Sequence, residues 1–232
     1  FIKKSILQYY FYNLNMNILG FNTSTEKFSL AISKNNQIVY YISKNFKKNC
    51  SKYLIPIIKD SLIKTNMKLE EINVISISVG PGSFTGIRLG IAAAKGLSMP
   101  YNINILGFNN MELIVDSIDN KIEEKNFLVL IRGKKNDFFY QLFNNKKKKI
   151  SNISFFSDFK LPNLRGSKKI VIVGDLDKKI QSQIKSINKK KFICFKQKFF
   201  SAKSLINLSI RNLLKKNTKD IEPVYVYNHY AK

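Results

Sequence analysis

The chain has 232 residues, of which 44% are hydrophobic, so it is long enough for one large domain or two smaller lobes with apolar cores. Forty Lys and Arg residues against 15 Asp and Glu residues give a formal charge of +25, a balance typical of proteins that bind nucleic acid or another polyanion. The two cysteines, Cys50 and Cys194, form no C-x-x-C pair, which excludes a disulfide scaffold and leaves no cysteine zinc motif.

The first fifteen residues carry no clear element. Lys3 and Lys4 precede apolar residues as in a secretory signal peptide, but Asn and Gln interrupt the apolar stretch and no small-residue cleavage site follows. Met16 stands directly before the first convincing strand. We therefore expect translation to begin there, and residues 1–15 to be a disordered or upstream read-through extension, or at most a short appended element.

The first half of the chain alternates between strand and helix patterns. The expected elements are strands 17–22, 28–33 and 37–43, helix 51–66, strand 71–80, helix 85–98 and strand 103–108. Helix 51–66 has apolar residues at helical spacing, namely Leu54, Ile57, Ile58, Leu62 and Ile63, and Pro56 should kink it or mark its first turns. The order β-β-β-α-β-α-β predicts a mixed α/β layer, with an antiparallel hairpin that leads into parallel strands.

The second half repeats this pattern more faintly. Its expected elements are helix 109–120, strands 127–132, 137–143 and 169–175, and an amphipathic helix over 201–216 with Leu205, Leu208 and Leu213 inward. We therefore expect two similar lobes, an N-terminal lobe over 16–108 and a smaller, diverged C-terminal lobe over 109–232.

The glycine-rich stretch "GPGSFTGIRLG" (80–90) does not fit the common nucleotide or nucleophile motifs. No Lys follows Gly86 as a Walker loop requires, and the glycine spacing is G-x-G-x-x-x-G instead of the dinucleotide pattern. A nucleophile elbow would read G-x-S-x-G, and the single histidine, His229, lies near the end of the sequence. Free N–H groups at the start of the following helix could still bind an anion weakly, with candidate contacts at Thr23, Ser24, Ser83 and Thr85.

Small residues recur every fourth position in this stretch, at Gly82, Gly86, Gly90 and Ala94. From Gly86 onward they line one helix face with almost no side chain, which lets another backbone approach closely. Each glycine inside a helix lowers its stability by about 1 kcal/mol relative to alanine, so a close contact should offset this cost at Gly90. The neighbour is either part of the same chain, such as helix 51–66, or another molecule.

Three segments together resemble one family. The segments "ILGFNTSTEKFSLAI" (18–32), "VGPGSFTGIRLGIAAAKGLS" (79–98) and "EPVY" (222–225) are similar to those of TsaB proteins, which are needed to make threonylcarbamoyladenosine next to the tRNA anticodon. The correspondence runs from about Met16 to the end of the sequence and is thin through 110–215. It implies an α/β fold of two RNase H-like lobes, as in the actin, hexokinase and Hsp70 ATPases, and a cytoplasmic protein.

The resemblance also implies a role without catalysis. TsaB would bind its paralogue TsaD, which carries the metal and transfers the threonylcarbamoyl group to N6 of adenosine, and the ATP-hydrolysing TsaE would join them. Without TsaD the chain could pair with a second copy of itself. It would contact tRNA only through the assembled complex. No cofactor of its own is implied, although a nucleotide could lie at the partner interface. The family's pairing surface maps here to Gly82, Phe84, Gly86, Arg88, Leu89, Gly90, Ala93, Ala94 and Leu97.

Individual residues agree with a lost catalytic function. Asn22 stands where ATPases of this superfamily place an acidic residue near Mg²⁺, and an amide lacks the charge that favours a divalent ion. One histidine cannot supply the pair of histidines that metal-dependent members use. The sequence departs from the TsaB pattern at Asn22, at Cys50 in place of a common His, and in the turn 132–137, where Arg132 and Lys134 replace an acid and an Arg. These changes put in doubt any function of that turn.

Two other function classes remain open. One is a stand-alone glycoprotease-type hydrolase, and the other is a basic RNA-binding module. Only four of the forty basic residues are Arg, a bias that compositional drift toward A and T can produce. The charge lies in scattered runs such as 144–150 and 188–192 without interleaved aromatic residues, which weakens the RNA-binding alternative. No run of eighteen uncharged apolar residues occurs, so no membrane span is expected.

Overall fold

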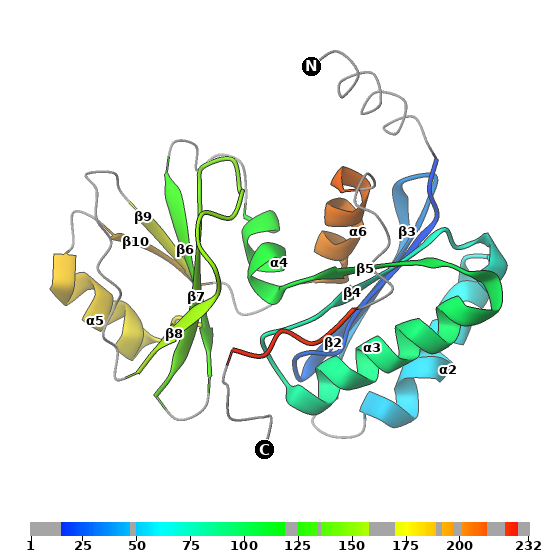
Figure 1. Cartoon of the computed structure of the whole chain (residues 1–232), viewed down its shortest axis with the longest axis horizontal. Helices are drawn as coiled ribbons and strands as arrows, with labels where there is room; N and C mark the ends of the chain where they lie inside the picture. Colours follow the sequence, from blue (N-terminus) through cyan, green and yellow to red (C-terminus); the bar gives the residue numbers. More distant parts are fainter. Residues whose placement is uncertain are drawn as a thin grey trace, which may run out of the picture. The chain divides into compact units, whose positions relative to one another are not determined.

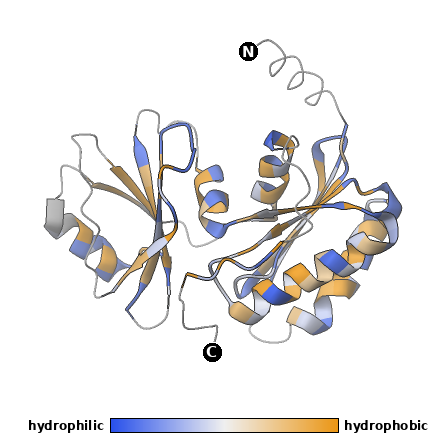
Figure 2. Ribbon diagram, in the orientation of Figure 1, coloured by the Kyte–Doolittle hydropathy of each residue, from blue (hydrophilic) through white to orange (hydrophobic). Residues whose placement is uncertain are grey.

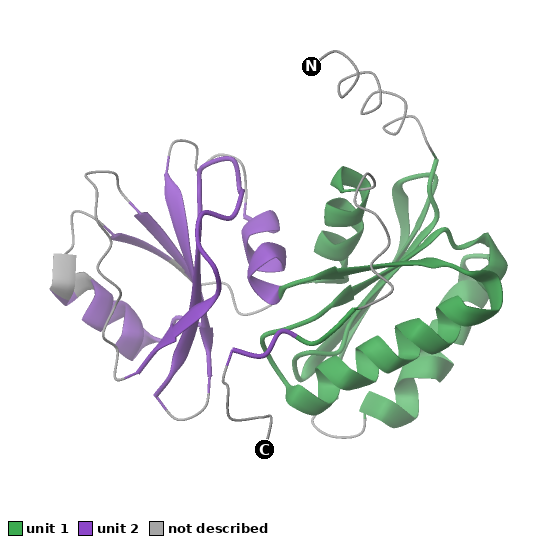
Figure 3. Ribbon diagram, viewed as in Figure 1, with its two compact units in different colours: residues 1–109, 201–223 green, residues 110–200, 224–232 purple. Residues whose placement is uncertain are grey.

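The computed structural model describes residues 15–46, 50–118, 125–133, 136–157, 170–188, 192–196, 201–212 and 221–226. The chain divides into two compact units, residues 1–109 with 201–223 and residues 110–200 with 224–232 (Figure 3). Each unit is built on a five-stranded sheet. Residues 1–14 lie outside the described part, so the expectation for this extension stays a prediction.

The sheet of unit 1 has the strand order β3-β2-β1-β4-β5. Its strands are β1 (Ile18–Asn22), β2 (Lys27–Lys34), β3 (Gln37–Asn45), β4 (Val74–Ser78) and β5 (Asn104–Phe108). β1, β2 and β3 pair antiparallel, whereas β4 pairs parallel with both β1 and β5. Every residue of β1 and β4 is buried, which indicates that both faces of the sheet centre are covered.

Three helices cover this sheet: α2 (Cys50–Lys64), α3 (Phe84–Ser98) and α6 (Ala202–Arg211). Gly20 faces α6 and the adjacent residue Phe21 faces α3, and because successive strand residues point to opposite faces, α6 and α3 lie on opposite sides of the sheet (Figure 1). Two further turns of 3₁₀ helix lie at Leu69–Glu71 and Met99–Tyr101.

Small residues on one face of the sheet allow α6 to approach closely. A Cβ on Gly20 would lie 3.1 Å from Cδ1 of Ile206 and 3.3 Å from the carbonyl oxygen of Ala202. The Ser76 hydroxyl donates to the Leu205 carbonyl oxygen at 3.2 Å, and the Ala202 N–H donates to Ser29 Oγ at 3.0 Å. The serines of β2 and β4 therefore bond the backbone of α6.

Unit 2 repeats the topology of unit 1. Its strands are β6 (Asn126–Arg132), β7 (Phe138–Phe143), β8 (Ser154–Phe156), β9 (Ile170–Gly174) and β10 (Phe192–Lys196), in the order β8-β7-β6-β9-β10. β6, β7 and β8 pair antiparallel, and β9 pairs parallel with β6 and β10, as in unit 1. Two described helices, α4 (Asn110–Asp116) and α5 (Lys178–Asn188), belong to this unit. The expected α/β fold of two RNase H-like lobes is confirmed.

Two details differ from the expected elements. β8, α5 and β10 were not among the predicted elements, and the helix of 201–216 was predicted in the second lobe. Residues 201–223 pack with unit 1 instead, because the apolar face of α6, with Leu205 and Ile206 fully buried, lies on β1, β2 and β4. None of the described helices is long and apolar enough to cross a membrane.

Candidate functional site

The turn between β4 and α3 is tied to the turn after β1. The Gly80–Pro81 peptide is cis and Gly80 has a φ of 100°, a value that favours glycine. The Ser83 N–H donates to the Ser24 carbonyl oxygen at 2.8 Å, and Ser83 Oγ accepts the Gly86 N–H at 3.2 Å as the N-cap of α3. A backbone hydrogen bond therefore joins the two turns, and the capping bond fixes the start of α3.

Asn22 lies at the centre of a buried polar cluster. Its Oδ1 accepts the Ser24 N–H at 2.9 Å, the Ser24 hydroxyl at 2.7 Å and the Ser78 hydroxyl at 2.7 Å. All three residues are buried. An amide oxygen offers two lone pairs, so three donors use its accepting capacity fully. Asn22, which stands where a metal-binding acid was expected, is thus hydrogen-bonded within the chain.

The four residues considered for cofactor contact fall into two groups. Thr23 and Ser24 are buried, and the Thr23 hydroxyl donates to the Gly86 carbonyl oxygen at 2.6 Å. Ser83 and Thr85 lie exposed at the start of α3. Among the described residues no group of three or more His, Cys, Asp or Glu side chains could hold a metal ion. Binding of a nucleotide in this region stays a prediction.

The small stripe of α3 faces the chain's own first strand. A Cβ on Gly90 would lie 2.5 Å from Thr23 Oγ1 and 3.9 Å from Phe21 Cε2, and a Cβ on Gly86 would overlap the Thr23 carbonyl oxygen. Ala94 is fully buried. Gly86, Gly90 and Ala94 are therefore covered by the chain itself, so their expected place on the pairing surface is wrong. The close neighbour is β1 and the turn after it, and not helix 51–66.

The other residues expected at a partner interface lie on the open sides of α3, except Gly82, which precedes the helix. Gly82 and Arg88 are exposed, and Phe84, Leu89, Ala93 and Leu97 are half-buried. The Arg88 guanidinium lies 3.9 Å from the centre of the Phe84 ring. We call the set Phe84, Arg88, Leu89, Ala93, Gly96 and Leu97 the α3 outer face; Gly96 joins it because it is exposed and a Cβ there would meet no atom within 4 Å.

Helix α2 adds exposed apolar residues that were not predicted from the sequence. Ile55 is 49% exposed, and Ile63, one of the apolar residues expected at helical spacing, is 67% exposed. Figure 2 shows α2 and α3 on the same side of unit 1, with hydrophobic residues along both ribbons. The helical spacing of 51–66 contained too many apolar residues for one buried face, and this excess was the signal of an exposed apolar surface.

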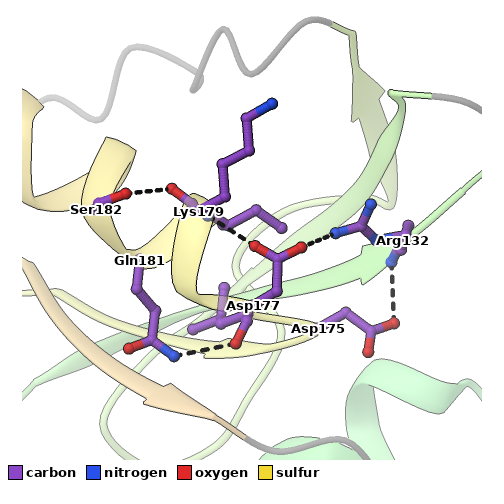
Figure 4. Close-up of polar contacts among 8 residues, drawn as sticks. Arg132, Asp175, Asp177, Lys179, Gln181 and Ser182 are labelled. Carbon is purple, nitrogen blue, oxygen red and sulfur yellow. Dashed lines mark hydrogen bonds and ion pairs between the residues drawn. The ribbon is translucent and has the colours of Figure 1, made fainter.

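A second polar cluster lies in unit 2, at the carboxyl ends of β6 and β9 (Figure 4). Arg132 Nη2 lies 2.6 Å from Asp177 Oδ2, and the Arg132 N–H donates to Asp175 Oδ2 at 3.3 Å. Asp177 Oδ1 accepts the Ile180 N–H at 2.8 Å in the first turn of α5. The Ile180 N–H is the main cause that lowers the pKa of Asp177 below its ordinary value; desolvation opposes it, and the Arg132 charge adds to it.

This cluster borders a cavity of about 230 Å³. The lining residues are Arg132, Asn136, Phe138, Asp177, Lys179, Ile180 and Gln183. Arg132 is the residue of the turn 132–137 that stands in place of an acid, and its guanidinium now pairs with Asp177. Lys134, the other changed residue, lies outside the described residues.

Comparison with known proteins identifies the family. Residues 42–219 match the family described as TsaD, tRNA N6-adenosine threonylcarbamoyltransferase. The tRNA threonylcarbamoyladenosine biosynthesis protein TsaB of Buchnera aphidicola subsp. Schizaphis graminum is 31% identical over 175 residues, 72% of this chain and 81% of that protein. The chain belongs to the TsaB family. The TsaB protein of Buchnera aphidicola subsp. Acyrthosiphon pisum is 27% identical over 92% of this chain and 98% of its own length.

The solved structures agree with this assignment at the level of the fold. YeaZ from Pseudomonas aeruginosa superposes with a TM-score of 0.74 and 14% sequence identity, covering 90% of this chain and 99% of that chain. The TsaB family takes part in tRNA threonylcarbamoyladenosine biosynthesis, so this chain belongs to that tRNA modification pathway. The α3 outer face and the Arg132 cavity are the two candidate sites of this TsaB-family chain.

Proposed function

We propose that this chain is a non-catalytic subunit that binds and organises TsaD, together with TsaE, during threonylcarbamoyl transfer to N6 of the adenosine next to the anticodon. The observation that carries the proposal is the α3 outer face, which presents Leu89, Ala93 and Leu97 half-exposed on a helix whose opposite side is locked to β1. A rigid helix with small and apolar outward residues provides a surface onto which another helix can pack.

The site chemistry supports a role without catalysis. The chain contains one histidine in all, so it cannot offer a histidine pair to a metal ion. The oxygen of Asn22 accepts three hydrogen bonds from Ser24 and Ser78 and carries no charge. A hydrated divalent ion prefers charged oxygen ligands that remain accessible. These features support a subunit that positions a catalyst.

The shared family supports TsaD as the occupant of the α3 outer face. The match to the TsaD description covers 42–219, which includes α2 and α3, so a TsaD protein should carry related helices at the same place. Two related helix pairs can pack against each other with pseudo-twofold symmetry. The same geometry allows a second copy of this chain to occupy the surface when TsaD is missing.

The test uses matched charge substitutions on two helices of unit 1. Ala93→Glu places a carboxylate on the α3 outer face, and Asn207→Glu places one at an exposed position of α6, on the other side of the sheet. Isothermal titration with TsaD should show at least a tenfold loss of affinity for Ala93→Glu and none for Asn207→Glu, because an unpaired charge in an apolar contact costs several times RT. Modification of tRNA by the reconstituted proteins should fall in parallel.

Two results would contradict this proposal. One is an Ala93→Glu variant that binds TsaD as tightly as the unchanged chain. The other is a peptidase activity of the purified chain that disappears on metal chelation, since it would indicate a stand-alone hydrolase.

A further inference from the structure

We propose that the cavity beside Arg132 in unit 2 binds one backbone phosphate of RNA. The inference rests on the proposed function only in that tRNA is the RNA expected near this chain. The site lies in a different unit from the α3 outer face, so the two proposals involve separate residues.

Arg132 is held in a fixed position at the cavity wall. Its Nη2 pairs with Asp177 Oδ2 at 2.6 Å, and its guanidinium carbon lies 5.4 Å from the centre of the Phe138 ring. Asp177 is itself fixed, because its Oδ1 caps the first turn of α5. The Arg132 side chain remains 44% exposed. A guanidinium restrained on two sides keeps its other N–H groups ready for an anion, with little loss of conformational entropy.

The cavity offers donors and few acceptors. Both oxygens of Asp177 already accept hydrogen bonds, from Ile180 and Arg132. Within the described residues, the side chains of Asn136, Lys179 and Gln183 have no recorded hydrogen-bond partner, and all three line the cavity. An ammonium group donates only, and each amide can turn its NH₂ group toward a ligand. A cavity lined in this way favours an oxyanion.

The charge of the lining favours a phosphodiester over a free nucleotide. Arg132 and Lys179 contribute two positive charges and Asp177 one negative charge, which leaves one positive charge for the ligand. A phosphodiester carries a single negative charge, whereas a nucleoside triphosphate carries several and normally needs a divalent ion. In the part of the chain that the structure describes, no acidic or histidine cluster could hold that ion. The formal charge of +25 attracts RNA to the surface as a whole.

Two adjacent lysines allow a matched test. Lys178 and Lys179 both lie exposed in the first turn of α5, but only Lys179 lines the cavity. Lys178→Gln and Lys179→Gln remove the same charge one residue apart. Binding of a fluorescent tRNA anticodon stem–loop to the full chain, followed by anisotropy at several salt concentrations, measures both the affinity and its salt dependence.

We expect Lys179→Gln to weaken RNA binding roughly tenfold at low salt, because a charge-assisted hydrogen bond is lost. The slope of log K against log salt should decrease by about one, which corresponds to one phosphate contact. Lys178→Gln should change the affinity less than about twofold and leave the slope unaltered. Arg132→Gln should behave like Lys179→Gln, with Arg211→Gln, an exposed arginine of α6, as its control. Equal losses for the two lysine variants would overturn the proposal, since the charge would then act diffusely.

A second experiment distinguishes a backbone phosphate of RNA from a free phosphate ion as the ligand. Inorganic phosphate is titrated into the unchanged chain and the Lys179→Gln variant, and binding is followed by the chemical shifts of the lysine side chains. Phosphate that binds with Lys179 while the RNA affinity stays independent of Lys179 would overturn the assignment to RNA. The RNA titration is repeated with the TsaD complex and with Ala93→Glu. Unchanged TsaD binding by Ala93→Glu, together with Lys179-dependent RNA binding, defeats only the proposed function. Loss of TsaD binding by Ala93→Glu, together with RNA binding that does not depend on Lys179, defeats only this inference.

Discussion

The Thr23 hydroxyl occupies the space that a side chain on Gly90 would need. A Cβ at Gly90 would lie 2.5 Å from Thr23 Oγ1, and that hydroxyl also donates to the Gly86 carbonyl oxygen at 2.6 Å. Helix α3 therefore carries glycine at these positions so that the turn after β1 can lie against its backbone. The glycine pattern fixes the helix within unit 1 and leaves its opposite side available.

Two glycines of α3 should respond to alanine in opposite directions. Gly90→Ala should destabilise the chain by about 1 to 3 kcal/mol, because the new methyl group overpacks against Thr23. Gly96→Ala should stabilise it by up to about 1 kcal/mol, since a Cβ there meets no atom within 4 Å and alanine favours the helix. Urea unfolding followed by circular dichroism measures both. Equal effects of the two substitutions would contradict this description of α3.

The polar cluster around Asn22 should contribute strongly to stability. Asn22→Ala leaves the Ser24 N–H and two buried hydroxyls without their acceptor, and we expect a loss of roughly 3 kcal/mol. Ser78→Ala removes a single donor and should cost about 1 kcal/mol. Chemical unfolding of both variants gives the comparison, and the milder Ser78→Ala keeps the measurement possible if Asn22→Ala does not fold. A larger loss for Ser78→Ala than for Asn22→Ala would be inconsistent with Asn22 as the centre of the cluster.

Lys147, in the basic run 144–150, should have a structural role. Lys147 Nζ donates to the carbonyl oxygen of Asp116, the last residue of α4, at 3.4 Å. It also donates to the carbonyl oxygen of Ile118, beyond the end of that helix, at 2.6 Å. Lys147→Met should cost about 1 to 3 kcal/mol, because these carbonyl groups lose a charged donor. Lys148→Met, at an exposed neighbouring position, removes the same charge and should change stability by less than about 0.5 kcal/mol. Thermal unfolding of the two variants decides whether Lys147 differs from its neighbour.

The hydrogen bond from the Ile180 N–H to Asp177, aided by the Arg132 charge, should make part of the stability depend on acid pH. The folded pKa of Asp177 lies below the ordinary value of 3.8, so the ionised group stabilises the folded chain above that pH. This contribution is lost as the pH falls through the folded pKa. Asp177→Asn should therefore be less stable than the unchanged chain at neutral pH, and the difference should shrink in acid. Urea midpoints across this range measure the effect, and a difference that grows below pH 3.8 would refute it.

The elements of unit 1 could be predicted because their patterns are strong. β4 alternates and ends at a glycine turn, and α3 begins at the capping residue Ser83. β8 has only three residues, which is too short for a clear period. α5 has isoleucines at helical spacing among its lysines and glutamines, so its amphipathic pattern was a signal that could have predicted it. Only the spacing of Ile180 and Ile184, both buried, marked the inward side of α5.

The sequence predicted that α3 has a close contact, but not which segment of the chain makes it. The recurrence of Gly86, Gly90 and Ala94 showed correctly that something lies close to α3, because small residues at this spacing permit close packing. Periodicity within one segment carries no information about the neighbour, which is Thr23, more than sixty residues earlier than Gly86. The pairing of Arg132 with Asp177 likewise joins residues 45 positions apart and leaves no local pattern.

The placement of α6 on the first sheet has a consequence for synthesis on the ribosome. Translation proceeds from the N-terminus, so α6 emerges only after residues 110–200 have been made. Until then the face of the sheet that contains Gly20 and Ser76 lacks the helix that covers it in the folded chain. A nascent chain arrested before Ala202 would expose this surface to chaperones, and the first lobe would be completed only once α6 has been made.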